Sequence, residues 1–137
     1  MVCQTSWWYK YKCRGGPTLI VNMYNDNKNS DSIHKVIQFM KRKEWERNAN
    51  ESCLHFLWLG DFNSHHPLWD KHWNSHLFTR TNLDRAQEVN EIVAKYDLQM
   101  VLHKGMLTLQ AMSTGNLTRT NNVFMSCKLA NRVQGHT

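Results

Sequence analysis

An apolar run that ends abruptly at a glycine is the feature that most constrains how this chain can fold. The residues from Leu54 to Leu59 are apolar except for His55, and Gly60 follows directly. A short continuous apolar segment of this kind is typical of a strand buried on both faces of an α/β sheet. Glycine at its end lets the backbone turn sharply. The sequence therefore predicts a central strand that delivers the next residues to the carboxyl edge of a sheet.

Two polar residues, Asp61 and Asn63, follow this predicted strand. Ligands bind at the carboxyl edge of open α/β sheets, so a carboxylate and a carboxamide there can hold a water, a metal ion or a phosphate oxygen. The same run is also ordinary turn chemistry, because Asp and Asn side chains bond back to their own backbone. These residues alone allow a catalytic interpretation and a purely structural one.

The rest of the chain alternates predicted strands and helices, which indicates an α/β (α+β) fold. Strands are expected at residues 7–12, 18–24, 100–102, 107–112 and 122–126. Ser30 or Asp31 can cap a helix whose apolar face comprises residues 33, 36, 37 and 40. A second helix is expected at about residues 82–96, with Leu83, Ala86, Val89, Val93 and Tyr96 facing inward.

Several segments, in order along the chain, resemble one known superfamily. GDFN at residues 60–63 resembles the signature of the endonuclease/exonuclease/phosphatase superfamily, and HHPLW at 65–69 is similar to the endonuclease domains of non-LTR retrotransposons. NMYND at 22–26 resembles the strand-end motif that carries the family's active-site Tyr, and residues 108–124 resemble its closing block. The resemblance implies a partial two-sheet β-sandwich flanked by helices.

The resemblance also implies that the chain is one incomplete domain. At 137 residues the chain can bury a single core, whereas the family's sandwich is larger. The family's early Asn and metal-binding Glu have no candidate before Thr18, and its final Asp-His block is matched only by His136 without a preceding Asp. We therefore expect residues 1–137 to form a single domain truncated at the N-terminus and at the C-terminus.

The activity implied by the resemblance is metal-dependent hydrolysis of a phosphodiester bond in DNA. Asp61 would accept a proton from the attacking water, or orient it, and would be a ligand of Mg²⁺ or Mn²⁺. Asn63 would position the water or the phosphate, and Tyr24 would place its phenol near the scissile phosphate. A half-buried strand-end Tyr with its hydroxyl in water is the structural alternative for Tyr24.

The closing block departs from the family pattern at one position. Asn121 stands where the family carries an Asp, so a neutral carboxamide replaces the carboxylate that would orient the catalytic His. Such a replacement can preserve geometry and still remove most of the rate. The alternative function is therefore a non-catalytic remnant that binds nucleic acid; a small-molecule phosphatase of the same superfamily is a third hypothesis.

The segment from Asn63 to Phe78 concentrates histidine and tryptophan. His66 and Trp69, together with Thr108 of the closing block, are expected to bind substrate, since aromatic side chains beside basic groups commonly hold nucleic acid strands. Packing of these side chains within the protein is an open alternative. So is a zinc site, because His72 and His76 are four residues apart.

Charge and composition favour a polyanionic partner inside a cell. The net charge of +6 would attract a phosphate backbone, with Lys41, Arg42 and Lys43 grouped mid-chain. These three residues would equally suit the last turns of a solvated helix. No signal peptide or spanning helix is recognisable, and the four scattered cysteines fit reduced thiols, so we expect an intracellular chain without a membrane partner.

Overall fold

The computed structural model describes residues 6–13, 16–26, 28, 30–50, 55–110, 112–113, 115 and 117–134. The helices are α1 (Asp31–Asn50), the 3-10 helix η1 (His72–Leu77), α2 (Arg80–Lys95) and α3 (Cys127–Gln134). The strands are β1 (Ser6–Cys13), β2 (Gly16–Tyr24), β3 (His55–Asp61), β4 (Leu98–Met100), β5 (Leu109–Gln110), β6 (Leu117–Thr118) and β7 (Asn121–Ser126). The predicted α/β class is confirmed.

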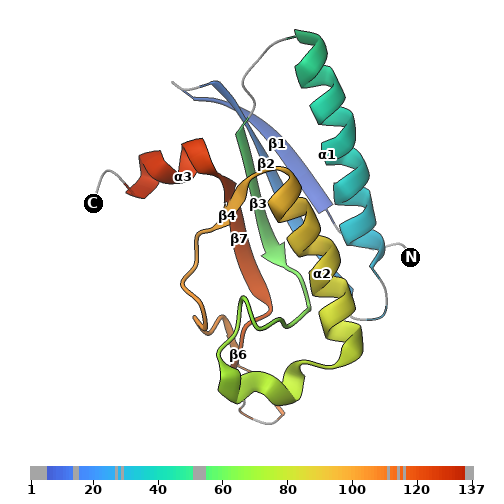
Figure 1. Ribbon diagram of the computed structural model, residues 1–137, viewed down its shortest axis with the longest axis vertical. Coiled ribbons are helices and arrows are strands. Elements are labelled where there is room, and N and C mark those ends of the chain that lie inside the picture. Colours follow the sequence, from blue (N-terminus) through green and yellow to red (C-terminus); the bar gives the residue numbers. More distant parts are fainter. Residues whose placement is uncertain are drawn as a thin grey trace.

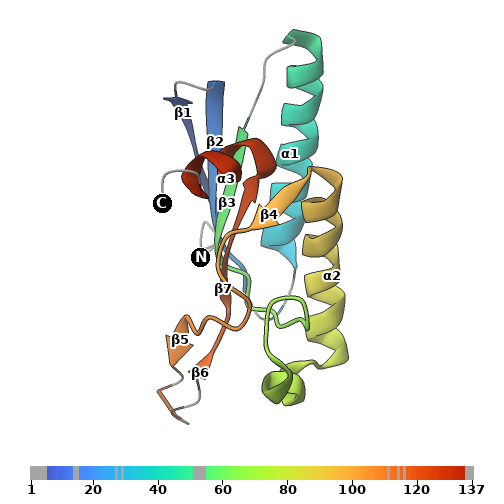
Figure 2. The same ribbon diagram turned by 60° about the vertical axis from the view of Figure 1, so that its left-hand side comes forward.

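Two sheets organise the fold. The larger one has the strand order β1-β2-β3-β7-β4, in which β2 and β3 run parallel and the other neighbours run antiparallel. β5 and β6 form a separate two-stranded hairpin, which extends past the end of the larger sheet at which β7 begins (Figure 2). The carboxyl ends of β2 and β3 therefore meet the start of β7 at one edge.

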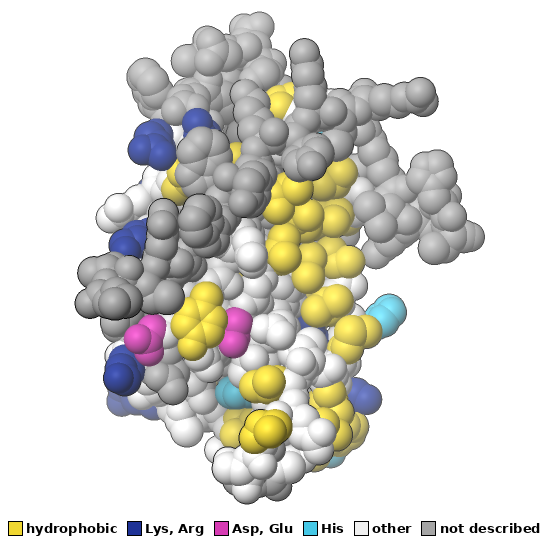
Figure 3. Space-filling model, turned by 180° about the vertical axis from the view of Figure 1, so that it is seen from behind, with side chains coloured by type: hydrophobic (Ala, Val, Ile, Leu, Met, Phe, Trp, Pro, Cys, Tyr) yellow, Lys and Arg dark blue, Asp and Glu magenta, His cyan; other side chains and the backbone are white. Residues whose placement is uncertain are grey.

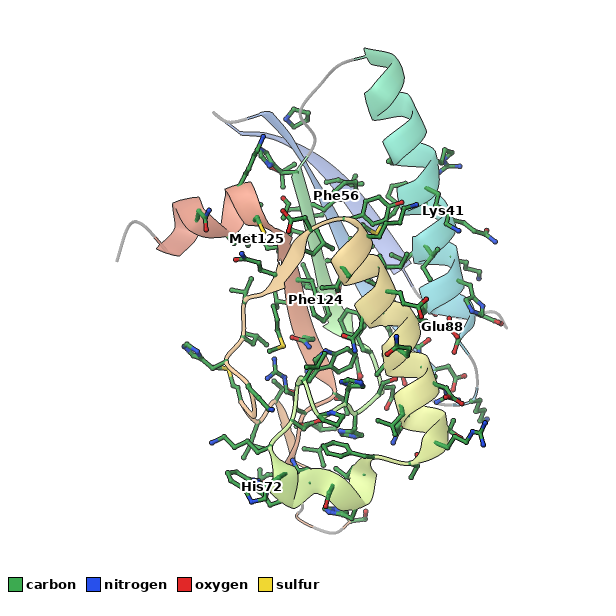
Figure 4. All side chains as sticks on the ribbon, in the orientation of Figure 1. Lys41, Phe56, His72, Glu88, Phe124 and Met125 are labelled. Atoms are coloured by element: carbon green, nitrogen blue, oxygen red, sulfur yellow. The ribbon has the colours of Figure 1, made fainter. Side chains whose placement is uncertain are left out.

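Helices α1 and α2 lie side by side over one face of the larger sheet (Figures 1 and 2). Apolar side chains from that face and from the two helices form the core: Leu19, Val21, Met23, Phe56, Trp58 and Phe124 from the strands, and Ile33, Val36, Met40, Ala86, Val89 and Ile92 from the helices. His34 on α1 pairs with Glu88 on α2, with 2.7 Å between Nε2 and Oε2; Glu88 is labelled in Figure 4. The alternation of buried and exposed positions in β2 follows from this one-sided cover.

An aromatic cluster extends this core beneath the end of β3. Phe62 is fully buried, and its ring packs edge-on against Trp58 and Phe124, with ring centroids 5.0 and 5.4 Å apart. Trp69 closes the cluster from the following loop, 6.1 Å from Phe62. Phe62 lies between Asp61 and Asn63 in the sequence, so its buried ring anchors both polar residues to the core. Removing so large an aromatic surface from water is strongly favourable.

Several expectations about the elements need correction. The prediction that β3 is buried on both faces is wrong, since Leu57 and Leu59 are only partly buried on the face that α1 and α2 leave uncovered. α2 begins at Arg80 rather than near Asn82, because the Thr79 side chain caps it by accepting a hydrogen bond from the Asn82 N–H at 3.3 Å. α1 continues to Asn50, so Lys41 to Lys43 lie in its middle and not in its last turns.

Some elements were not predicted at all. The 3-10 helix η1 lies in a segment where the sequence signals only a loop, and β6 and α3 have no matching expectation. Leu54 and His136 fall outside the described residues, as do the cysteines other than Cys13 and Cys127, and Cys127 is a free thiol. A search of the described helices finds none with the length and apolar character needed to span a bilayer.

Candidate active site

Three of the predicted catalytic residues lie in one row across three strands. In the parallel pair β2–β3, Tyr24 is opposite Asp61, and in the antiparallel pair β3–β7, Asp61 is opposite Asn121. Neighbouring strands lie about 5 Å apart, and side chains at paired positions project from the same face. Asp61 is therefore flanked by a phenol on one side and a carboxamide on the other, although the three residues are far apart in the sequence.

The row lies on the sheet face that α1 and α2 do not cover. Met23 and Asn122, the neighbours of Tyr24 and Asn121, are buried, so Tyr24 and Asn121 project to the opposite side. Tyr24 is 54% exposed, and Asp61 and Asn121 are partly exposed. Figure 3 views this side of the molecule and shows an exposed hydrophobic side chain between two acidic ones, with basic side chains along the left edge. Solvent can therefore reach the row.

Gly60 makes the close approach of β2 and β3 possible at this edge. Its φ is +137°, a region that side-chain-bearing residues avoid. A Cβ atom placed on it would lie 1.9 Å from the carbonyl oxygen of Met23. The glycine is required both for its backbone conformation and for space, and it brings Asp61 into register beside Tyr24.

Asn63 follows in a left-handed conformation, with φ of +48°. Its backbone N–H donates to Oδ1 of Asp61 at 2.9 Å, while its side-chain Nδ2 donates to the carbonyl oxygen of Asn25 at 3.0 Å. The backbone amide, and not the carboxamide, thus bonds to the carboxylate of Asp61. The structural interpretation of these residues as a turn is compatible with their interpretation as a site, because the turn itself orients the Asp61 carboxylate.

Thr108 lies at the same edge and supports Asn121. Its hydroxyl oxygen accepts a hydrogen bond from the Asn121 N–H at 3.2 Å, and its own N–H donates to the carbonyl oxygen of Thr118 at 3.0 Å. The structure therefore brings Tyr24, Asp61, Asn63, Thr108 and Asn121 to one sheet edge, while their catalytic and substrate-binding roles stay predictions.

His66 and Trp69 do not share this surface equally. Trp69 is 3% exposed, and its indole N–H donates to Oδ1 of Asn90 at 3.1 Å. Packing, the alternative left open by the sequence, therefore describes Trp69, and the prediction that it contacts substrate is not supported. His66 is partly exposed, its Nδ1 accepts a hydrogen bond from the Leu68 N–H at 3.1 Å, and burial lowers its pKa, so the ring is neutral near pH 7.

A buried polar network fixes the loop behind the row, and sequence reasoning missed it. Arg119 is 1% exposed and donates to Oδ1 of Asn122 at 2.9 Å and to the carbonyl oxygen of Trp69 at 3.0 Å, as well as to the carbonyls of Leu102 and His103. Burial lowers the pKa of Arg119, and the nearby charge of Asp70 opposes that shift. No local pattern signals a buried arginine, since the partners are mostly main-chain carbonyls from other segments.

Asp70 belongs to the same network. Its carboxylate is buried, and Oδ2 lies 3.2 Å from Nδ1 of His65, which is buried as well. The loop that carries HHPLW is thus tied by His65 and Asp70 internally, and by Arg119 to the start of β7. The side chains of His65 and Asp70 therefore hold the loop in place and are not exposed to a ligand.

Neither the zinc alternative nor the basic cluster of residues 41–43 adds to this sheet edge. Within the described residues, no group of three or more His, Cys, Asp or Glu side chains could hold a metal ion, so the zinc alternative for His72 and His76 finds no third ligand there. The basic residues 41–43 lie on α1, which covers the other side of the sheet, where Figure 4 labels Lys41. Arg42 and Lys43 lie 5.4 and 5.8 Å from the ring centroid of Phe39 on the same helix.

Comparison with known proteins places this geometry in context. The endonuclease-reverse transcriptase family model matches residues 18–134. Among solved structures, the chain is similar to the endonuclease domain of TRAS1, a telomere-specific non-LTR retrotransposon, with a TM-score of 0.64 and 13% sequence identity. The match covers 93% of this chain and 52% of that one, so the chain spans about half the length of the TRAS1 structure. The likeness shows a common fold. A comparison with curated proteins finds no match.

Proposed function

This chain belongs to the endonuclease-reverse transcriptase family, and from that premise we propose that it is a nuclease domain that hydrolyses phosphodiester bonds in DNA. The observation that carries the proposal is the row of Tyr24, Asp61 and Asn121 at one exposed sheet edge. A carboxylate flanked by a phenol and a carboxamide offers both a proton acceptor and hydrogen-bond donors to a phosphate that lies across the edge.

Asp61 has the central part in this proposal. Its carboxylate accepts a proton from the attacking water or orients that water, and the hydrogen bond from the Asn63 N–H fixes its direction. General-base help of this kind is worth about 10²–10⁴-fold in rate. The phenol of Tyr24 and the carboxamide of Asn121 donate to non-bridging phosphate oxygens, and Thr108 keeps Asn121 in place.

The donor set of the row suits a hard divalent cation. Asp61 offers a carboxylate oxygen, Asn121 an amide oxygen and Tyr24 a phenol oxygen, and Mg²⁺ is commonly held by one or two carboxylates together with waters and substrate phosphates. We propose that Asp61 holds Mg²⁺, or Mn²⁺ in its place. When bound, the ion would neutralise charge that develops on the leaving oxygen.

Nicking of supercoiled plasmid tests the proposal. The purified chain with Mg²⁺ should convert supercoiled DNA to the open circular form, and Asp61→Ala should abolish the conversion. Asp84→Ala is the matched control, because Asp84 is an exposed carboxylate on α2, which covers the opposite face of the sheet. Equal nicking by the wild-type chain and Asp61→Ala would indicate a contaminating nuclease and contradict the proposal.

One observation favours a second candidate function, a non-catalytic nucleic-acid-binding domain. Asn121 puts a neutral amide where a second carboxylate beside Asp61 would strengthen metal binding. The net charge of +6 would still draw a phosphate backbone to the protein. A gel shift of labelled DNA that weakens steeply with salt, without any nicking in Mg²⁺ or Mn²⁺, would support this second function.

A further inference from the structure

Asn25 makes one hydrogen bond to each residue of the Asp61–Asn63 turn. Its N–H donates to the carbonyl oxygen of Asp61 at 2.8 Å, and its side-chain Nδ2 donates to the carbonyl oxygen of Phe62 at 3.2 Å. Its own carbonyl oxygen accepts from Nδ2 of Asn63 at 3.0 Å. A single residue at the end of β2 thus holds the whole turn that follows β3.

The burial of Asn25 shows that this arrangement has a cost. Asn25 is 0% exposed, and its Oδ1 has no hydrogen-bond partner within the described part of the chain. A buried amide oxygen without a partner destabilises the folded state, so a small apolar residue would avoid that loss. What the asparagine adds over such a residue is the bond from Nδ2 to the Phe62 carbonyl.

The turn needs support because Asn63 is in a left-handed conformation. With φ of +48°, its backbone is in a region that residues other than glycine seldom occupy. In this conformation its N–H reaches Oδ1 of Asp61. On the other side of the turn, the Phe62 N–H donates to the carbonyl oxygen of Thr120 at 2.9 Å. The turn is therefore held from β2 by Asn25 and from the start of β7 by Thr120.

We propose that Asn25 is a positioning residue for the nuclease reaction, which acts by holding the Asp61–Asn63 turn so that the Asn63 N–H fixes the Asp61 carboxylate. The inference rests on the proposed function. Asn25 itself is too deeply buried to touch substrate, so its effect reaches the reaction only through Asp61 and Asn63. Groups that act on a reacting atom need to be held to within about 0.5 Å, which a single lost bond in the turn can disturb.

Amide hydrogen exchange tests the structural half of this proposal without any need for activity. In Asn25→Ala, exchange at the Asn63 N–H should become at least about tenfold faster, because the bond to Asp61 is no longer held. The Trp58 N–H in the middle of β3 should keep its protection. Asn74→Ala is the matched control, because Asn74 is a buried asparagine on η1 whose N–H donates to the carbonyl oxygen of Lys71, and its replacement should leave Asn63 unchanged.

Steady-state kinetics test the other half. Asn25→Ala should lower kcat about tenfold or more and leave KM within about twofold, since a positioning residue affects the chemical step and not DNA binding. Asn74→Ala should leave both constants unchanged. If Asn25→Ala does not fold, Asn25→Leu, which has a similar shape and no donor for the Phe62 carbonyl, provides the same comparison.

The outcomes separate the two proposals. Unchanged exchange at Asn63 in a folded Asn25 variant would overturn the positioning proposal, and so would a rise in KM with unchanged kcat. If the wild-type chain does not cleave DNA, the proposed function fails. Faster exchange at Asn63 would then still establish that Asn25 holds the turn, while its role in a reaction would be refuted.

Discussion

Asp61 and Asn121 are directly paired across β3 and β7, so a carboxylate and a carboxamide lie side by side at the end of a three-strand row. Tyr24 completes the row from β2. Because of this pairing, Asn121 is the residue of the site whose replacement is most informative. Asn121 sits where a second acid would be in direct contact range of the first.

Replacement of Asn121 by Asp should raise nicking in Mg²⁺ by about tenfold or more, because two neighbouring carboxylates bind a divalent ion better than one. Without metal the like charges should repel and lower the melting temperature. Added Mg²⁺ should therefore raise the melting temperature of N121D more than that of the wild type. Gln38→Glu, at an exposed position on α1, adds the same charge away from the row and should show neither effect. A variant N121D that gains no metal-dependent stability would argue against an ion at Asp61.

Gly60→Ala should prevent folding or lower the free energy of unfolding by about 3 kcal/mol or more, since both the backbone angle and the contact with Met23 forbid a Cβ atom. Gly115→Ala is the control. Its φ is +68° and nothing lies within 4 Å of the added atom, so only backbone strain of about 1 kcal/mol is expected. Urea denaturation measures both. Similar losses for the two variants would show that β2 and β3 do not approach closely at Gly60.

Arg119→Met should lower the free energy of unfolding by about 3 kcal/mol or more, because it removes the positive charge near buried Asp70 and the guanidinium bonds to Asn122 and to three main-chain carbonyls. Arg119→Lys should recover little of this loss, since an ammonium group cannot replace the planar guanidinium fork. Arg80→Met, at a fully exposed position, should change stability by less than about 0.5 kcal/mol. A loss for Arg119→Met no larger than that for Arg80→Met would refute the buried network.

The stability of the fold should fall as pH decreases because of His66. Burial lowers its pKa below the usual value of 6.5, so the unfolded chain takes up a proton first as the pH falls through that value. The contribution of the neutral ring is complete above pH 6.5 and declines between that value and the lowered pKa. The drop in melting temperature between about pH 7.5 and 5.5 should be smaller in His66→Gln than in the wild type. His72→Gln, on an exposed surface, should retain the full drop.

The main lines of the fold and most of the site could be predicted from sequence because their signals are local. Apolar spacing located α1, and the run before Gly60 located β3. The motif residues Tyr24, Asp61 and Asn121 were identified individually, and pairing of β2, β3 and β7 then places them in one row. Asp61 and Asn63 could be found from their place after an apolar run that ends in glycine, because strand ends converge at a sheet edge. Tyr24 and Asn121 were found through the resemblance of their motifs to the superfamily.

The remaining features depend on tertiary contacts that leave no local pattern. For Trp69 the sequence left substrate binding and packing open, and the structure shows that its ring fills the core beside Phe62. Arg119 and Asn25 bond chiefly to main-chain carbonyls of distant segments. Such bonds depend on where the fold brings those carbonyls, so no local pattern in the sequence predicts them. The sequence also could not show that the Asn63 backbone, and not its carboxamide, bonds to Asp61.

The proposed function depends on the carboxylate of Asp61 as the group that drives phosphodiester hydrolysis at this sheet edge. The most direct measurement is the initial rate at which equal concentrations of the wild-type chain and of Asp61→Asn nick supercoiled plasmid in Mg²⁺. The isosteric change keeps the hydrogen bond from Asn63 possible and removes the charge and the proton acceptor. The rate for Asp61→Asn should be at least about 10²-fold lower than that of the wild-type chain. Equal rates, or no nicking by the wild-type chain, would contradict the proposed function.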